Sequence, residues 1–338
     1  MHINILAIES SCDDTSAAVM QDTKVLSNVI AGQDVHFSYG GVVPELASRA
    51  HQQHIIPVVD TAIVSSGLQK TDIDAVAYTN GPGLLGSLMV GTSFAKAFAL
   101  AINIPLIEVD HLDAHIMAHF IAGQHPSPPE FPFLCLTVSG GHTQITVVKD
   151  HLHHTIIGKT IDDAAGEAFD KAAKILGLGY PGGPIIDKLA KKGNKHKFLF
   201  SEPKIAGLDF SYSGLKTSFL YHIRDNIKKD PDYITNNINS LVASIQETII
   251  NILIHKVTLA AKKTGITTIA LAGGVSANSA LRERILEEGE KNKWKVFIPN
   301  IEYTTDNAAM IGITGYYKYK AKLFSSLDAT PYTRSSSK

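Results

Sequence analysis

The stretch that decides the fold is "INILAIESSCDDTSAAVM" (residues 3–20), because it has a counterpart later in the chain. It reads as an apolar strand, a polar turn and a second strand, and "FLCLTVSGGHTQITVVK" (133–149) repeats that order. Each of these segments is followed by a strand, a glycine turn and a long helix, first in 74–101 and again in 268–288. This repetition predicts an internally duplicated α/β protein with two similar lobes and an interlobe cleft lined by the turns.

Proline and polar residues dominate "IAGQHPSPPEFP" (121–132), which is the expected link between the two halves. We place the N-terminal lobe at residues 1–120 and the C-terminal lobe at 131–300. A C-terminal helix at about 306–325 is expected to pack back on the first lobe. Apolar residues recur at helical spacing in 241–261, which predicts a core helix.

The composition is typical of a globular protein. The 338 residues are 44% apolar and 19% charged, and the formal net charge is −1, so any contact with nucleic acid needs a local basic patch. Cys12 and Cys135 lie far apart in sequence, which is typical of a reducing compartment. No apolar run approaches the roughly 20 residues of a membrane span, and the start lacks the features of a signal peptide. We expect a mature cytoplasmic protein with no membrane contact and a mobile tail, "ATPYTRSSSK" (329–338).

Four turns rich in small residues follow the predicted strands, at 9–14, 81–87, 139–142 and 272–278. Such turns expose backbone N–H groups, and a following helix adds a dipole that favours an anion. A single turn of this kind is equally explained by the need for a tight turn, whereas four in matched positions favour a nucleotide site. The G-x-x-x-x-G-K-[ST] motif does not occur in the sequence, which excludes a P-loop protein.

Three histidines are spaced four residues apart in "VDHLDAHIMAHF" (109–120): His111, His115 and His119. On a helix the three imidazoles share one face. A pair at i and i+4 can hold one divalent cation if a carboxylate joins it from elsewhere, and the alternative is a set of half-buried histidines without a ligand. The zinc-peptidase motif H-E-x-x-H has glutamate where this chain has Leu112, which disfavours proteolysis.

The duplicated hairpins and turns are similar to those of the actin, Hsp70 and sugar-kinase (ASKHA) superfamily. Within it, the chain resembles the bacterial TsaD family of tRNA threonylcarbamoyladenosine synthesis proteins. The segments that carry this resemblance extend from about residue 4 to about residue 315: "AIESSCDDT", "GGVVPELASRAH", "HLDAH", "VSGGHTQ", "DDAAGEAFDKAAKILGLGYPGGP", "FSYSGLKTS", "LAGGVSAN" and "TTDNAAMIG". The resemblance implies transfer of the threonylcarbamoyl group of threonylcarbamoyl-AMP to N6 of adenosine 37 in tRNAs that read ANN codons, with release of AMP.

The resemblance also implies a metal held by the two histidines of H-x-x-x-H and the aspartate of "TDNA". Carried over, the ligands are His111, His115 and Asp306, and this set with open positions suits one Fe(II) or Zn(II) per subunit. The metal would polarise the carbonyl and hold it for attack by the amine. His119 lies outside the motif, and we expect it to be a partly exposed helix histidine.

The family's substrate contacts fall on the second half of the chain, where the cleft would hold threonylcarbamoyl-AMP or AMP, with ATP as a further candidate. A carboxylate suits ribose hydroxyls because it accepts their hydrogen bonds. Without the resemblance, the two aspartates of this set read as helix-surface acids and its glycines as turn residues. The implied substrate-binding residues are Thr137, Val138, Ser139, Gly140, Gly141, Asp170, Gly183, Asp187 and Asn278.

The first turn supplies the candidate catalytic residues. Asp13 or Glu9 is placed to orient or deprotonate the amine, and the alternative is that both satisfy the backbone of the turn. The family usually has Asp-Glu after the cysteine, so the shorter Asp14 puts a direct role of that position in doubt. Asp110, where the family often has Asn or His, is expected to cap the helix that carries the histidines.

Partners follow partly from the residues and partly from the resemblance. The segment "DKLAKKGNKHKF" (187–198) carries five lysines, which either neutralise tRNA phosphates or form a solvated loop. The resemblance implies two protein partners, a shorter ASKHA paralogue (TsaB-like) and a P-loop ATPase (TsaE-like). Two other functions stay open: an ATP-dependent kinase or Hsp70-like ATPase that does not need the histidine pair, and a non-catalytic nucleotide-binding scaffold.

Overall fold

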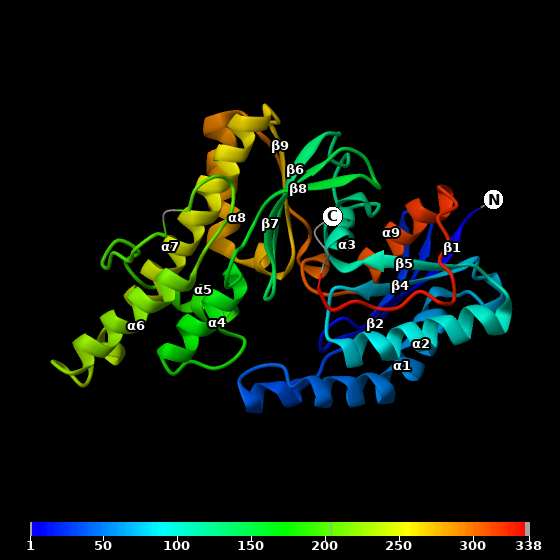
Figure 1. The fold of residues 1–338 in the computed structure, drawn as a ribbon, viewed down its shortest axis with the longest axis horizontal. Coiled ribbons are helices and arrows are strands. Elements are labelled where there is room, and N and C mark those ends of the chain that lie inside the picture. Colours follow the sequence, from blue (N-terminus) through cyan, green and yellow to red (C-terminus); the bar gives the residue numbers. More distant parts are fainter. Residues whose placement is uncertain (1, 204, 335–338) are drawn as a thin grey trace. The chain divides into compact units, whose positions relative to one another are not determined.

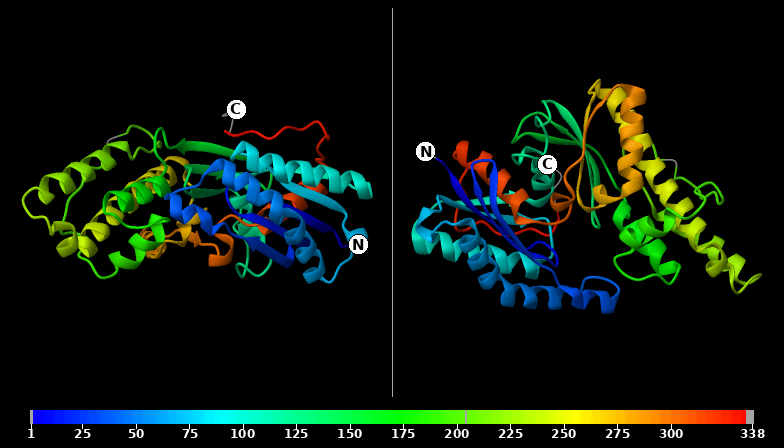
Figure 2. Two further views of the ribbon diagram at one scale, coloured as in Figure 1. Left: turned by 90° about the horizontal axis from the view of Figure 1, so that it is seen from below. Right: turned by 180° about the vertical axis from the view of Figure 1, so that it is seen from behind.

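The structure is a computed structural model that describes residues 2–203 and 205–334. The chain divides into two compact units (Figures 1 and 2). Unit 1 comprises Met1–Pro129 and Pro299–Lys338, and unit 2 comprises Glu130–Ile298. The chain therefore leaves unit 1 near the end of the proline-rich stretch and returns to it for its last part.

Unit 1 contains a five-stranded sheet of β1 (Asn4–Glu9), β2 (Thr15–Gln21), β3 (Lys24–Ala31), β4 (Ala75–Gly81) and β5 (Leu106–Asp110). The strand order is β3-β2-β1-β4-β5. The first three strands are antiparallel, and β4 and β5 run parallel to β1. The predicted hairpin in residues 3–20 is therefore confirmed, and the carboxyl ends of β1, β4 and β5 meet at one edge of the sheet.

Helices cover both faces of this sheet. The helical elements of unit 1 are α1 (Pro44–Ser66), α2 (Leu85–Ile102), α3 (His111–Met117), α9 (Ala308–Lys320) and the 3₁₀ turns η1 (Asp34–Tyr39), η2 (Lys70–Asp72), η3 (Ala118–Phe120) and η5 (Ile301–Tyr303). Helices α1 and α2 pack on one face and α9 on the other (Figure 1). Because side chains alternate along a strand, Leu6 and Ile8 join the core under α1 and α2, while Ile5 and Ala7 lie toward α9.

Helix α9 lies close to the sheet because two glycines face it. A Cβ on Gly315 would approach the Cβ of Ala77 to 2.5 Å, and a Cβ on Gly312 would meet Ala7 and Met20. The last helix of the chain is thereby held against the first strands, in the same unit as α3.

The expectation that no apolar run approaches a membrane span is wrong for α2, whose 18 residues are long and apolar enough, by length and composition alone, to cross a membrane. It packs against α1 and β4. Its buried face consists mostly of small residues: Ser87, Leu88, Gly91, Thr92, Ala95 and Ala99. A Cβ on Gly91 would clash with Ser10, so the small residues allow close approach to the sheet.

Unit 2 repeats the sheet of unit 1. Its strands are β6 (Phe133–Val138), β7 (Thr143–Val148), β8 (His154–Lys159), β9 (Thr268–Ala272) and β10 (Lys295–Phe297). Read from its other side, the strand order is β8-β7-β6-β9-β10, which corresponds strand for strand to β3-β2-β1-β4-β5 of unit 1. The strand directions also match. The predicted duplication is confirmed.

The helical elements of unit 2 are α4 (Ala165–Ile175), α5 (Gly182–Ala190), α6 (Ser213–Ile227), α7 (Tyr233–Thr264), α8 (Ser279–Asn292) and the 3₁₀ turn η4 (Gly274–Ala277). They share one hydrophobic core with the sheet. The predicted core helix at 241–261 is confirmed as part of α7, which is longer at both ends. It ends at Gly265, whose left-handed conformation (φ 73°) terminates the helix.

The expectation of a mobile tail is wrong for the described residues 329–334. Lys96 Nζ donates to Ala329 O at 2.6 Å. Tyr332 N donates to Asn80 O at 2.9 Å, and the Tyr332 hydroxyl donates to Asp110 Oδ2 at 2.6 Å. Specific hydrogen bonds thus hold this segment on unit 1, and its composition alone did not indicate these long-range partners. Residues 335–338 lie outside the described residues.

Candidate metal centre

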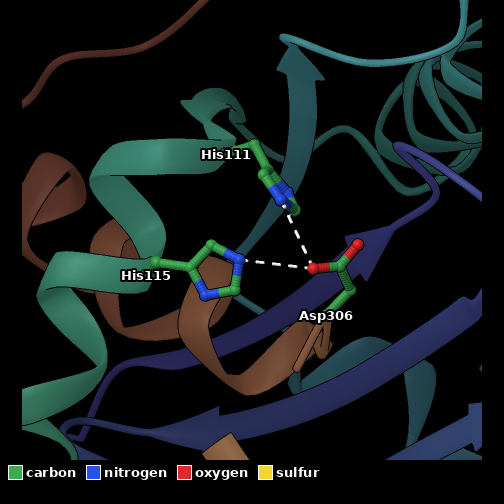
Figure 3. A group of neighbouring side chains, drawn as sticks. All are labelled: His111, His115 and Asp306. Carbon is green, nitrogen blue, oxygen red and sulfur yellow. Dashed lines mark ion pairs between the residues drawn. The ribbon is translucent and has the colours of Figure 1, made fainter. Parts of the chain in front are cut away.

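The histidine pair lies on α3, which starts where β5 ends. Asp110 caps this helix, because its Oδ1 accepts hydrogen bonds from Leu112 N at 2.8 Å and Asp113 N at 3.1 Å. The predicted capping role of Asp110 is confirmed. Since His111 is the first helical residue and His115 follows one turn later, both rings lie on one face of α3 (Figure 3).

The carboxylate of the cluster comes from the other end of the chain. Asp306 lies two residues before α9, and the intervening Asn307 caps that helix by accepting from Met310 N at 3.1 Å. Ala308 N donates to Ser16 Oγ at 2.9 Å, which fixes the start of α9 on the first hairpin. The packing of α9 on the sheet therefore places Asp306 beside α3.

The three side chains converge on one point (Figure 3). Asp306 Oδ1 lies 3.4 Å from His111 Nε2 and 3.2 Å from His115 Nε2, and the three ligand atoms lie within 4.8 Å of one another. Two ligands that sit roughly 2.1 Å from a shared ion at 90–110° are separated by about 3.0–3.4 Å. The two separations from Asp306 fall in this range, which is the spacing of a carboxylate and an imidazole that share a divalent cation.

The burial of these groups also fits a metal site. Both imidazoles are buried, whereas the Asp306 side chain is 26% exposed, which leaves the cluster accessible from one side. Neither ring nitrogen of His115 has a hydrogen-bond partner of good geometry among the described residues. A buried imidazole whose nitrogen faces a carboxylate oxygen without a hydrogen bond is suited to metal ligation.

Glu9 holds the other side of the His111 ring. Its Oε2 lies 3.1 Å from His111 Nδ1 and accepts from Thr79 Oγ1 at 2.5 Å, and its Oε1 accepts from Ser11 N at 2.5 Å. A hydrogen bond from Nδ1–H to Glu9 leaves the Nε2 lone pair directed at the metal position. Glu9 is fully buried, and both of its carboxylate oxygens accept hydrogen bonds or face His111. In this structure it therefore contacts His111 and its own turn. The spacing of residue types in the sequence did not indicate the contact between Glu9 and His111. The one available signal was position: Glu9 ends β1, and His111 follows β5, which runs parallel to β1.

The electrostatics of the cluster are those of a cation site. Burial disfavours the charged imidazolium of His111, but the carboxylates of Asp306 and Glu9 outweigh it and raise the His111 pKa well above its usual value. Burial lowers the pKa of His115, which favours its neutral, ligating form. Burial opposes the charge on Asp306, yet the two histidines hold its pKa well below the usual range.

Two further carboxylates lie in the first turn. Asp13 and Asp14 are partly exposed. Burial, followed by the charges of Asp13, Asp306 and Glu9, raises the pKa of Asp14 to about 7. Asp13 is therefore the less enclosed of the two candidate bases, since Glu9 is buried.

His119 does not join the cluster, and the prediction that it is partly exposed is wrong. It is 1% exposed, and its Nδ1 lies 3.0 Å from His125 Nε2. Helix α3 ends at Met117, and His119 belongs to the 3₁₀ turn η3. A 3₁₀-helix has three residues per turn, whereas an α-helix has 3.6. The change at η3 therefore turns His119 away from the helix face that carries His111 and His115.

The predicted substrate residues all lie in unit 2 and begin at the end of β6. Thr137 and Val138 are buried strand residues. The turn that follows is closed by Ser139, whose N donates to His142 O at 2.8 Å and whose O accepts from Gly166 N at 3.2 Å. The exposed glycines of this turn, Gly140 and Gly141, have open space at their Cβ positions.

The predicted carboxylates link neighbouring helices. Asp170 on α4 accepts from Gly182 N at 2.8 Å at the start of α5. Burial raises the pKa of Asp170, while the amides of Gly182 and Gly183 act in the opposite direction. Gly183 has open space at its Cβ position. Asp187 on α5 accepts from Ser279 Oγ at 2.9 Å at the start of α8.

Asn278 lies beside a cavity of unit 2. It caps α8 through Leu281 N, and its Nδ2 donates to Gln246 Oε1 at 2.8 Å. Gln246 and Ser279 line a cavity of about 350 Å³. Asn278 and Asp187 thus each bond to a cavity-lining residue. The other lining side chains include the cations Lys191, Lys195 and Arg284 and the carboxylates Glu247, Glu283 and Glu287.

Comparison with known proteins agrees with this fold and with the sequence motifs. Residues 24–313 match the family model of TsaD, tRNA N6-adenosine threonylcarbamoyltransferase. The chain is 57% identical over 332 residues to the enzyme of that name from Christiangramia forsetii and 58% identical over 334 residues to that from Porphyromonas gingivalis; each match covers 98% of both chains.

Solved structures share the fold at low identity. HypF from T. kodakarensis matches with a TM-score of 0.64 at 15% identity, over 94% of this chain and 48% of that chain. Component A of the Acidaminococcus fermentans (R)-2-hydroxyglutaryl-CoA dehydratase matches with a TM-score of 0.53 at 15% identity, over 94% and 99%. These likenesses show an ASKHA-type fold, and the family match and curated relatives are more specific. The chain belongs to the TsaD family of tRNA N6-adenosine threonylcarbamoyltransferases.

Proposed function

We propose that this chain transfers the threonylcarbamoyl group of threonylcarbamoyl-AMP to N6 of adenosine 37 in tRNAs that read ANN codons. The observation that carries the proposal is the convergence of His111, His115 and Asp306, from two distant segments, in a member of this family. These three residues would hold one Fe(II) or Zn(II). When bound, the ion would supply Lewis-acid polarisation of the carbamoyl carbonyl.

The residues of unit 1 would prepare the reaction. Glu9 fixes the ring of His111, and Asp13 is the candidate acceptor for the proton of the N6 amine. The N6–carbonyl carbon bond forms, the bond from that carbon to the phosphate oxygen breaks, and AMP leaves with the bonding pair. Because AMP is a good leaving group, positioning of the amine and carbonyl contributes more than acid–base catalysis.

The adenylate is assigned to unit 2. A cavity of about 350 Å³ is within the range for small-molecule sites. Its lining includes Lys191, Lys195 and Arg284, and the last two are paired with Glu247 at 3.3 and 3.1 Å. Asp187 and Asn278 would set the edge of this site through Ser279 and Gln246.

The macromolecular partners are also proposals. The five lysines of the segment 187–198 are exposed, which supports contact with tRNA phosphates. By the family resemblance, full activity would need the TsaB-like paralogue and the TsaE-like ATPase. Cys12 and Cys135 are free thiols, which supports a cytoplasmic location.

Reconstitution tests the proposal directly. The purified chain, the two partners, threonylcarbamoyl-AMP and unmodified tRNA should yield threonylcarbamoyladenosine, measured by chromatography of digested tRNA. His111→Ala, His115→Ala and Asp306→Ala should each reduce the yield at least a hundredfold, since each removes a proposed ligand. His119→Gln is the matched control, because it alters a buried histidine of the same segment outside the cluster. An undiminished yield with His111→Ala would contradict the proposal.

The same reactions distinguish the alternatives. A kinase or Hsp70-like ATPase would turn over ATP with Mg²⁺ and would be insensitive to His111→Ala. A scaffold would support product formation by a partner and would tolerate all three substitutions. Family membership and the intact triad favour the transferase.

A further inference from the structure

The C-terminal strap, defined as residues 325–332, runs beside the edge strand of unit 1. Ser325 N donates to Leu106 O at 2.8 Å, and Glu108 N donates to Ser325 Oγ at 2.7 Å. Farther along, Ala329 O accepts from Lys96 Nζ at 2.6 Å. The strap therefore forms hydrogen bonds with β5 and α2 before it reaches the carboxyl ends of β4 and β5.

Tyr332 is the last anchored residue of the strap. Its N donates to Asn80 O at 2.9 Å, at the end of β4. Gly81 lies directly beneath it, and a Cβ at this position would clash with the carbonyl oxygen and ring of Tyr332. With φ at 149°, Gly81 has a backbone conformation that favours glycine, so the end of β4 is shaped to receive the tyrosine.

The hydroxyl of Tyr332 reaches the residue that caps the histidine helix. Asp110 uses its two oxygens differently: Oδ1 accepts from Leu112 N and Asp113 N of α3, and Oδ2 accepts from Tyr332 Oη at 2.6 Å. One carboxylate thus joins the strap to the first turn of α3. The residue that follows Asp110 in the chain is His111.

We propose that Tyr332 is a positioning residue for the histidine pair and acts through Asp110. Helix α3 has only seven residues, so its geometry depends on tertiary contacts and on its cap rather than on its own helical propensity. The Tyr332 hydroxyl restricts the Asp110 carboxylate to the orientation that caps α3. This orientation fixes the start of the helix, and with it the separation of the two imidazoles from Asp306. The role in metal binding rests on the proposed function.

The test uses full-length variants that differ by one hydroxyl. Tyr332→Phe keeps the ring over Gly81 and removes the hydrogen bond to Asp110. Tyr319→Phe, which removes a hydroxyl from α9 instead, is the matched control. Two quantities are measured on the metal-depleted protein: the affinity for Co(II) by its visible absorption, and hydrogen–deuterium exchange of the α3 amides.

We expect Tyr332→Phe to weaken Co(II) binding roughly 3- to 10-fold, less than the 10- to 100-fold typical of a residue that contacts a ligand directly. Exchange of the α3 amides should accelerate, whereas Tyr319→Phe should match the parent protein in both measurements. In an Asp110→Asn background, where the amide still offers an oxygen to cap α3, Tyr332→Phe should have a smaller effect, because the partner carboxylate is gone.

The outcomes separate this inference from the proposed function. If the parent protein binds Co(II), and Tyr332→Phe changes neither the affinity nor the exchange of α3, the inference is overturned. If the parent protein binds no metal, the proposed centre fails. The exchange of α3 then still decides whether Tyr332 positions the helix, since that measurement needs no ion.

Discussion

His111 is held on both sides of its ring, by Glu9 at Nδ1 and by Asp306 at Nε2. This arrangement fixes the direction of the ring, with Nδ1 toward Glu9 and Nε2 toward Asp306. A ligand fixed in this way loses little freedom on binding, which favours affinity. At the scale of single residues, the centre is therefore defined by the groups around its ligands as well as by the ligands.

Glu9→Gln tests this arrangement. The glutamine amide cannot accept hydrogen bonds at both ends as the carboxylate does, so the His111 ring loses its partner or the turn loses a contact. We predict a loss of metal affinity of about 10- to 100-fold, measured by titration of the metal-depleted protein. Glu45→Gln, at an exposed position of α1, should leave the affinity unchanged. Equal affinities of Glu9→Gln and the parent protein would show that Glu9 does not orient the ligand.

Asp14 gives a pH-dependent prediction. Its folded pKa of about 7 lies above the value of about 4 expected in the unfolded chain. The stability associated with this group is therefore fully present below pH 4 and is lost as the pH rises through 7. Asp14→Asn removes this loss. Chemical denaturation of the metal-free protein should show the variant gaining on the order of 1–3 kcal/mol relative to the parent between pH 5 and pH 8, allowing for solvent screening. A pH-independent difference would contradict the raised pKa.

At the scale of elements, α9 connects the first strands to the metal centre. Its two glycines allow the close packing that places Asp306 beside α3. A side chain at Gly315 would displace the helix, because the facing atom is the Cβ of Ala77 on β4, which cannot rotate away. Stability and metal binding are thus coupled through one helix.

Gly315→Ala measures this coupling. We predict a loss of about 1–3 kcal/mol in the free energy of unfolding, from denaturant titration, together with weaker metal binding. Gly214→Ala on α6 is the control, since its Cβ would meet only Pro203 at an ordinary 3.6 Å and alanine favours helix. An unchanged stability of Gly315→Ala would mean that α9 tolerates the displacement.

Local patterns were sufficient to predict the two hairpins, the two strand-turn-helix segments and the core helix, because alternation and spacing report burial within one element. They were not sufficient for contacts between distant segments. The pair of Tyr332 and Asp110 is separated by 222 positions, and the pair of Glu9 and His111 by 102. The tail was therefore expected to be mobile, and Glu9 was expected to act on the amine or to satisfy its own turn, not to contact His111. The position of His119 was also missed, because a change from α-helix to 3₁₀ turn leaves no signal in the spacing of the histidines.

At the scale of the whole molecule, the two units carry different parts of the proposed chemistry. The metal triad belongs to unit 1 and the residues implied in adenylate binding belong to unit 2. The two sheets have the same topology, so in each unit the turns after the parallel strands lie at one end of the sheet.

The lysine-rich segment of unit 2 gives a prediction for tRNA binding. Lys188 and Lys192 are exposed and do not line the cavity. The double variant Lys188→Ala/Lys192→Ala should weaken tRNA binding and lower the slope of log affinity against log salt by about one to two, while leaving the KM for threonylcarbamoyl-AMP unchanged. The corresponding arginine variants should retain binding. An unaltered salt slope would place the tRNA phosphates elsewhere.

The measurement that most directly tests the account is the metal content of the chain and its ligand variants after reconstitution, determined by mass spectrometry of the bound metal. We predict one divalent ion per chain in the parent protein and in His119→Gln. In His111→Ala, His115→Ala and Asp306→Ala the content should fall below about a tenth of that, with a parallel loss of threonylcarbamoyladenosine formation. Asp306→Ala protein that retains one ion per chain and the full yield of modified tRNA would contradict the central claim.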